Sequence, residues 1–244
     1  MKKFKIGFTL AEVLITLSII GVVAAVTTPS LIMNYTKKTQ AVAIKKFVTQ
    51  LEDALTRYMA DNRADTLMEA GFDTAAGRND FFTNYFKIES NCGGDKASCF
   101  GSTYANINGT KKTFSESLNN WCSAAYTLKS GASFCISQAN YMNGGSYIID
   151  GKTHKLDYIY IDTNGKKGPN IAGRDYFLVY IFEDGSLDEQ YATPECRNNA
   201  NSANCRGKAT LKAARTADNC IGNADVWPAG CLGRLLENNW KMNY

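Results

Sequence analysis

Residues 8–28 form an apolar run that constrains the fold more than any other part of the sequence. The run reads FTLAEVLITLSIIGVVAAVTT, and Glu12 is its only ionisable side chain. A helix of these 21 residues is roughly 31 Å long at ~1.5 Å per residue, which matches a hydrocarbon core of about 30 Å. Lys2, Lys3 and Lys5 precede the run, and basic flanks favour the cytoplasmic side. The run therefore predicts a single-pass helix that delivers the rest of the chain outside the cytoplasm.

A cleaved secretory signal peptide is the main alternative for this segment. The apolar core of a signal peptide is usually ~7–15 residues long and ends at an Ala-x-Ala-like site. Here the run is longer, and helix-forming residues continue beyond it. The stretch VVAAVTT still offers a weak cleavage site after Ala25, so the signal-peptide alternative stays open.

The basic head, Gly7 and the stretch FTLAEVLITLSIIGVVAAV together resemble the N-terminal signature of type IV prepilins and type II secretion pseudopilins. The resemblance covers about the first thirty residues. It implies that a prepilin peptidase removes residues 1–7 as a leader, cutting between Gly7 and Phe8, and methylates Phe8. It also implies that Glu12 is the glutamate used in assembly and that Pro29 is the proline that bends or locally melts the helix.

The same resemblance implies a function and a set of partners. The chain is expected to be a structural subunit of a type IV pilus-like filament or a type II secretion pseudopilus, assembled through its N-terminal helix. Its expected partners are the prepilin peptidase and methylase, other pilin-like subunits in a helical filament, and an inner-membrane assembly platform. The expected location is the inner membrane, with the globular domain in the periplasm, and then the filament. An exported binding domain that stays anchored and never polymerises is the alternative.

Two explanations account for the carboxylate of Glu12. An isolated charge inside an apolar helix is costly and functional by default. Cleavage after Gly7 would create an α-amine at Phe8, and Glu12 of a neighbouring copy could neutralise that amine in a filament. Alternatively, the sequence from Thr9 to Glu12 is a capping box, which needs no second copy. Capping alone explains neither the basic head nor the length of the apolar run, so the sequence favours assembly.

After Pro29 the pattern changes to that of a soluble amphipathic helix over residues 29–62. One apolar stripe follows the i, i+3, i+4, i+7 spacing of a helix that packs on a core. Its members are Ile44, Phe47, Val48, Leu51, Ala54, Leu55, Tyr58 and Met59. Residues 8–62 are therefore expected to form one long helix, with 8–28 in the membrane, followed by a globular domain over 63–244.

The globular part carries several strand patterns. AAYTLKSGASFCIS predicts a hairpin with its turn at Ser130-Gly131, which would place Cys135 opposite Tyr126. LDYIYID and DYFLVYIF predict two further strands, and SYIID a short one. One long helix packed on an antiparallel sheet of about four strands is an α+β fold, and pilin-like proteins share this arrangement.

The chain has eight cysteines, all outside the apolar run. No two of them have the close spacing of a zinc site, and His154 is the only histidine. An even number of cysteines in an exported segment favours disulfides. Because consecutive pairing closes short loops, we expect the pairs Cys92–Cys99, Cys122–Cys135, Cys196–Cys205 and Cys220–Cys231. A bridge between Cys122 and Cys135 would have to form beyond the hairpin ladder.

The segment IDTNGKKGPNIAGRD places four oxygen-bearing side chains in a Gly-rich loop, namely Asp162, Asn164, Asn170 and Asp175. Oxygen ligands of this kind suit Ca²⁺, and some pseudopilins hold calcium beside this part of the sheet. The spacing departs from an EF-hand, because Gly165 comes fourth rather than sixth, and Lys166 adds positive charge. An ordinary hydrogen-bonded connection is the alternative and is favoured.

The sequence gives little support to an enzyme or a nucleic-acid-binding protein. It contains no G-x-S-x-G, P-loop, G-x-G-x-x-G or H-E-x-x-H motif. His154 is expected in a solvent-facing polar turn. Without residues 1–7 the chain has 24 basic and 23 acidic side chains, since the head holds three of the 27 lysines and arginines. Such a balance predicts no specific nucleic-acid partner.

Overall fold

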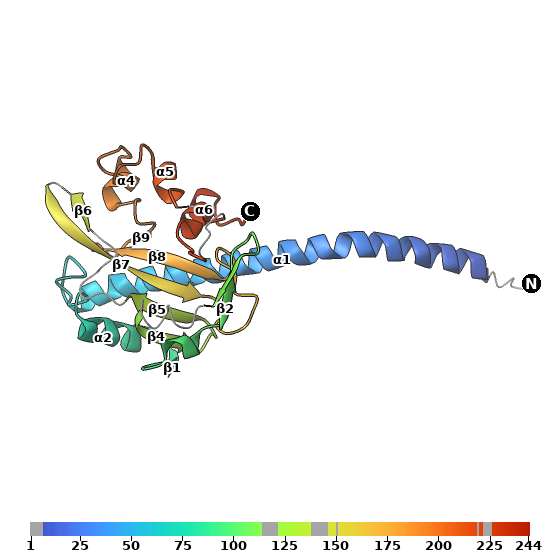
Figure 1. Cartoon of the computed structure of the whole chain (residues 1–244), viewed down its shortest axis with the longest axis horizontal. Helices are drawn as coiled ribbons and strands as arrows, with labels where there is room; N and C mark the ends of the chain where they lie inside the picture. The colour runs from blue at the N-terminus through green and yellow to red at the C-terminus, as the bar shows by residue number, and fades with distance from the viewer. Residues whose placement is uncertain (1–6, 114–121, 138–145, 150, 219, 222–225) are drawn as a thin grey trace, which may run out of the picture. The chain divides into compact units, whose positions relative to one another are not determined.

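A computed structural model describes residues 7–113, 122–137, 146–149, 151–218, 220–221 and 226–244 (Figure 1). The chain divides into two compact units, Met1–Thr39 and Gln40–Tyr244. One helix, α1 (Leu10–Asp61), contributes its first part to the N-terminal unit and its second part to the C-terminal unit. Its ends lie close to the predicted limits of 8 and 62. The basic head, residues 1–6 of the expected leader, lies outside the described residues.

The first part of α1 is exposed along its apolar length. Every residue from 7 to 36 is exposed, including large side chains such as Leu14, Ile20 and Val23. Within the described part of the chain, α1 is the one helix long and apolar enough to cross a membrane. The helix continues through Pro29 without a break, and a bend at Pro29 stays a prediction. Proline removes one backbone hydrogen bond, but the turns on both sides keep theirs.

The second part of α1 has a different surface pattern. Its buried residues all fall on one stripe at helical spacing and join the main core of the domain. They are Ala41, Ile44, Phe47, Val48, Leu51, Ala54, Leu55 and Tyr58. The predicted amphipathic stripe is confirmed, with Met59 partly buried at its end.

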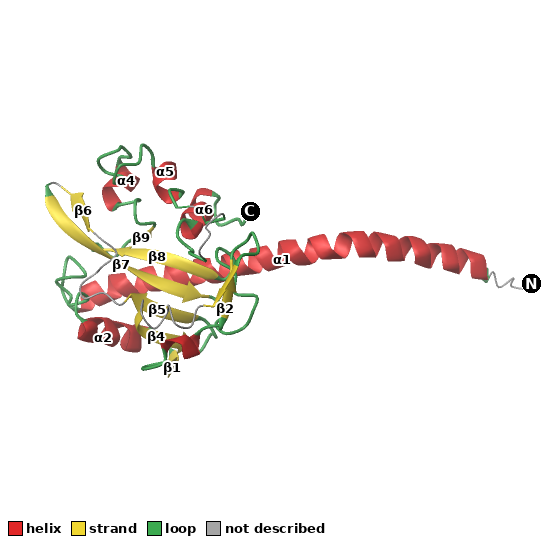
Figure 2. Ribbon diagram, viewed as in Figure 1, coloured by secondary structure: helices red, strands yellow, loops and turns green. Residues whose placement is uncertain are grey.

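A seven-stranded sheet faces this stripe (Figure 2). Its order is β1-β4-β5-β7-β8-β9, β6 pairs with β7, and every pairing is antiparallel. The strands are β1 (Ile88–Asn91), β4 (Cys122–Leu128), β5 (Ser133–Ser137), β6 (Ser146–Ile149), β7 (Lys152–Asp162), β8 (Tyr176–Phe182) and β9 (Leu187–Asp188). The α+β prediction is confirmed, but "about four strands" is too few. The expected strands are β4, β5, β7 and β8 at the centre and the short β6, which SYIID predicts. The added edge strands β1 and β9 are too short to show a pattern.

The β4–β5 hairpin departs from the predicted register by one residue. Cys135 lies opposite Ala125, and Tyr126 lies opposite Phe134. The turn contains three residues, 129–131, because Leu128 N–H donates to Ala132 C=O at 2.8 Å. Gly131 occupies the left-handed region (φ +88°), which a glycine adopts without strain. The extra turn residue shifts every pair along the ladder.

Both faces of the sheet are covered, and β8 shows this most clearly. All seven of its residues are buried. Phe177, Val179 and Ile181 face the core that contains α1. Tyr176, Leu178, Tyr180 and Phe182 alternate with them and join a second, tyrosine-rich core on the opposite face. A strand that is covered on both faces has a nearly continuous apolar sequence, as in DYFLVYIF.

Several short helices and a small second sheet complete the domain. The helices are α2 (Ala75–Tyr85), the 3₁₀ helix η1 (Lys96–Cys99), α4 (Pro194–Asn198), α5 (Leu211–Arg215) and α6 (Cys231–Glu237), and the second sheet pairs β2 (Thr103–Ala105) with β3 (Lys111–Thr113). Arg215 ties α5 to the sheet and to α6, through ion pairs to Asp188 at 2.7 Å and Glu237 at 2.9 Å. Trp240 and Tyr244 pack on the main core.

Four disulfides join the cysteines in consecutive order, as predicted. They are Cys92–Cys99, Cys122–Cys135, Cys196–Cys205 and Cys220–Cys231. The expectation that Cys122–Cys135 would form beyond the ladder is wrong. Cys122 pairs with Ser137 inside the β4–β5 ladder, and an irregularity between Cys122 and Ala124 brings Cys122 to 5.6 Å (Cα–Cα) from Cys135. The bulge compensates for the offset that a regular ladder would impose.

Candidate processing and assembly site

Gly7 and Phe8 lie just before the first turn of α1, in irregular backbone. Phe8 is 88% exposed. A Cβ atom built on Gly7 would meet no other atom within 4 Å. Packing within the described part of the chain therefore does not require glycine at position 7. The bond between these two residues is open to an external enzyme.

Glu12 forms a capping box with Thr9. The Thr9 backbone N–H and the Thr9 hydroxyl each donate to Glu12 Oε2 at 2.8 Å. In return, the Glu12 N–H donates to Thr9 Oγ1 at 3.3 Å. Both hydrogen bonds to the carboxylate use Oε2, and within the described residues Oε1 has no hydrogen bond. The capping alternative is therefore present in the structure, and one carboxylate oxygen remains for a second partner.

The loop between β7 and β8 brings three of the four candidate calcium ligands together. Asn164 connects the two acids, because its N–H donates to Asp162 Oδ1 at 3.1 Å and its Nδ2 donates to Asp175 Oδ2 at 3.3 Å. The Tyr104 hydroxyl donates to Asp162, and the Ile171 N–H donates to Asp175. Asn170 does not join this cluster, because its Nδ2 donates to Thr103 C=O at 3.5 Å. Hydrogen bonds thus join the loop residues to one another and to Tyr104.

Burial changes the protonation of these two acids. It raises the pKa of Asp162 to about 8, and the negative charge of Asp175 adds to the increase. It also raises the pKa of Asp175 to about 6, against hydrogen bonds that favour the charged form. Within the described residues, no three His, Cys, Asp or Glu side chains are grouped so that they could hold a metal ion. The side-chain oxygens of Asn164 and Asn170 accept no hydrogen bond there.

The match to a known sequence family falls on the first helix. The family model described as "Prokaryotic N-terminal methylation motif" matches residues 2–28. The chain carries the prepilin-type N-terminal signature. The matched segment includes Gly7, Phe8 and Glu12, the three residues that the sequence singles out for processing and assembly.

A curated protein is also similar to part of this chain. It is the type II secretion system core protein G of Aeromonas hydrophila, 35% identical over 77 residues. The aligned part is 32% of this chain and 53% of the relative, so the chain spans about half the length of the curated relative it matches. No solved structure shows significant similarity to the chain.

His154 does not lie in the predicted polar turn. It belongs to β7, opposite Tyr147 of β6. Its Nδ1 is 3.1 Å from Glu183 Oε2, and its ring stacks on Tyr147 with centroids 5.4 Å apart. The polar flanks Thr153 and Lys155 suggested a turn, but β6 supplies a strand partner. The side chain is thus fixed by structural contacts.

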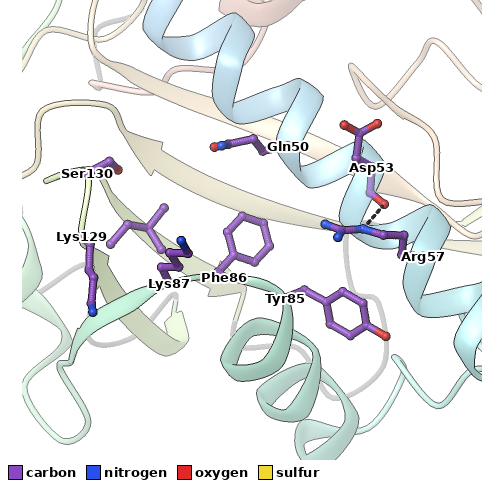
Figure 3. A pocket seen from close by; sticks show the side chains of 9 residues that line it. Gln50, Asp53, Arg57, Tyr85, Phe86, Lys87, Lys129 and Ser130 are labelled. Carbon is purple, nitrogen blue, oxygen red and sulfur yellow. Dashed lines mark hydrogen bonds between the residues drawn. The ribbon is translucent and has the colours of Figure 1, made fainter.

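The C-terminal unit also contains a groove that no pattern in the sequence indicates (Figure 3). It has a volume of about 340 Å³ and is lined by three segments that are far apart in the chain. They are Gln50, Asp53 and Arg57 from α1, residues 85–87 at the end of α2, and residues 128–130 at the end of β4 and the start of the β4–β5 turn. No spacing within any one segment indicates a shared surface, so only the fold reveals it.

Proposed function

We propose that this chain is a pilin-like structural subunit of a type IV pilus-like filament or a type II secretion pseudopilus. In this proposal, a prepilin peptidase cleaves between Gly7 and Phe8 and methylates Phe8. The mature chain stays in the inner membrane through α1, with its domain on the periplasmic side. An assembly platform then transfers it into a helical filament with other pilin-like subunits.

One observation carries the proposal. The methylation motif at residues 2–28 coincides with the exposed apolar part of α1. An exposed apolar surface of this extent needs lipid, or other apolar helices, to cover it. The membrane covers this surface with lipid before assembly. In a filament, the apolar helices of other subunits cover it. A heterologous contact that does not close on itself generates such a helical assembly.

Glu12 is proposed to set the stagger between neighbouring helices. Cleavage makes Phe8 the new N-terminus, which places a cationic amine at the cytoplasmic end of the segment. Glu12 Oε2 is used in the capping box, while Oε1 is available to the amine of an adjacent copy. The pair converts two isolated charges among apolar helices into a neutral contact. Capping and pairing are therefore compatible roles of one carboxylate.

Mass spectrometry of the mature chain extracted from membranes tests the processing step. The expected N-terminus is methylated Phe8, which leaves 237 residues after removal of seven. An N-terminus at Met1, or at a residue beyond Ala25, would instead support the anchored or secreted binding domain that does not polymerise. Glu12→Ala tests assembly separately, because cleavage should continue while the amount of chain in sheared fibres falls. Normal fibre yield from this variant would contradict the charge pair.

Calcium binding in the β7–β8 loop is a second, separate candidate. It is favoured by two buried carboxylates with raised pKa values and by two asparagine oxygens without hydrogen bonds among the described residues. Asp162, Asp175 and Asn164 would supply oxygen ligands, and Asn170 would have to turn toward them. The test is thermal unfolding of the full chain in detergent with Ca²⁺ and with EGTA. Equal unfolding temperatures would rule the site out, and Asp162→Asn should abolish any difference.

A further inference from the structure

The groove of Figure 3 gathers positive charge at one end. Lys87 and Lys129 lie side by side, because the Lys129 N–H donates to Lys87 C=O at 3.0 Å where β1 pairs with β4. Both side chains are exposed, and within the described residues neither forms an ion pair. Asp53 is the one acid in the lining. We call Arg57, Lys87 and Lys129, with the apolar floor beneath them, the basic groove.

The floor and Arg57 give the basic groove a defined shape. Phe86 and Leu128 line it, and Leu128 is buried. The Arg57 guanidinium lies over the Tyr85 ring, 5.9 Å from its centroid, and its Nε donates to Asp53 C=O at 3.4 Å. A stacked arginine loses less conformational freedom when it binds a carboxylate. The groove therefore suits an acidic segment that also carries an apolar side chain.

The same domain carries a matching acidic patch just beyond the end of α1. We define the acidic patch as Asp61, Asp65 and Glu69, all exposed. Asp61 accepts a hydrogen bond from the Tyr85 hydroxyl, so the patch begins at the Tyr85 end of the groove. Glu69 accepts one from the Asp65 N–H at 3.0 Å, which leaves the Asp65 carboxylate outside that contact. Met68, which is partly buried, lies between these acids, whereas Leu67 is buried in the main core.

The groove and the start of the acidic patch lie at different levels along α1. Asp53 marks the level of the groove, and Asp61, the last residue of the helix, lies eight positions further on, which corresponds to ~12 Å at ~1.5 Å per helical residue. Asp65 and Glu69 follow in the segment after the helix. Copies that pack with parallel α1 helices and no stagger would place like charges at the same height. A stagger along α1 instead brings the acidic patch of one copy to the basic groove of the next. Complementary charge of this kind favours the correct register over wrong ones.

We propose that the basic groove of one copy binds the acidic patch of a neighbouring copy, and that this contact fixes the stagger of the domains. The inference rests on the proposed function, because it needs copies with parallel helices. It differs from the Glu12 contact, which lies in the membrane segment. The groove is thus the acceptor half of a head-to-tail interface between identical chains.

Charge reversal in the full-length chain tests the contact. Lys87→Glu with Lys129→Glu should lower the yield of sheared fibres about tenfold, because like charges then meet across the interface. Asp65→Lys with Glu69→Lys should lower it to a similar extent. The four changes together should restore most of the yield. Lys166→Glu with Lys167→Glu, two exposed lysines on the β7–β8 loop, is the matched control and should assemble normally.

The outcomes separate this inference from the proposed function. If the parent chain forms fibres and the two reversals change nothing, the interface is absent while the filament subunit stands. If the groove reversal blocks fibres but the four changes together do not restore them, the groove binds a different partner and the inference fails. If the parent chain forms no fibres, the proposed function itself fails. Protease resistance of the domain in each variant shows whether it still folds.

Discussion

The two parts of α1 share one secondary structure and have opposite surfaces. The first part exposes apolar side chains all round, whereas the second buries one stripe and exposes polar residues elsewhere. Both parts satisfy their backbone groups within the helix, so the backbone does not explain the difference. The side chains determine what must cover each part. The first needs lipid or other helices, and the second needs a sheet.

Leu51→Ala, in the second part of α1, should lower the stability of the domain more than any other change considered below. Leu51 is fully buried against the sheet, so the change leaves a cavity in the main core. We expect the free energy of unfolding of the domain to fall by about 2–5 kcal/mol. Denaturant unfolding of the chain in detergent measures it, with exposed Thr49→Ala as the control. Equal stability of the two variants would show that the stripe does not anchor the domain.

Val22→Lys tests whether the first part of α1 must stay apolar to remain in the membrane. Val22 is exposed in the middle of the apolar run, where lysine is expected to cost about 2.5–3.5 kcal/mol in a bilayer. Retention in the membrane and fibre yield should both fall, while the domain keeps its unfolding temperature. Val22→Leu should leave all three unchanged. Full membrane retention of the lysine variant would argue against a spanning segment.

A pH series sharpens the comparison, because the domain buries acids that the first part of α1 does not. The pKa of Asp162 is raised to about 8 in the folded chain, so between about pH 4 and 8 the folded state holds a proton that the unfolded state has lost. This stabilisation is complete below the unfolded pKa and disappears as the pH rises through about 8. Glu189 of the main core, with a pKa of about 8, acts in the same direction.

Asp162→Asn should therefore reduce the loss of folding stability that occurs as the pH rises. We expect the variant to unfold about 2–4 °C higher than the parent at pH 8.5, which corresponds to about 1 kcal/mol, and to show no such gain at pH 4. Thermal unfolding at the two pH values measures the difference. A gain of equal size at both would show that the effect does not come from titration of Asp162.

Thr9→Ala should have the smallest effect and separates the two roles of Glu12. The change removes the hydroxyl contacts of the capping box and leaves the Thr9 N–H bond to Glu12 in place. Amide exchange at Leu10–Glu12 should become faster in detergent, while fibre yield stays near that of the parent. Thr9→Ser keeps the hydroxyl and serves as the control. A loss of fibres as severe as that of Glu12→Ala would show that capping, not pairing, is the role that matters.

Short-range features were predictable from the sequence because they depend on residues close together in the chain. The apolar run, the amphipathic stripe and the capping box are patterns within a few helical turns. The four disulfides close short loops, and consecutive pairing follows from that proximity. The register of the β4–β5 hairpin was missed because one additional turn residue shifts the whole ladder. Pro29 did not interrupt α1, since a single lost hydrogen bond is insufficient to melt a long helix.

From the sequence alone, one helix could be predicted to be apolar on all sides and then amphipathic, with a methylation motif spanning its start. The order of the seven strands, the strand position of His154 and the placing of Arg57, Lys87 and Lys129 around one groove depend on the tertiary structure. The reason is physical: periodicity and spacing record which face of an element is buried, but not which distant element buries it. That choice is made when three separate segments pack against one another.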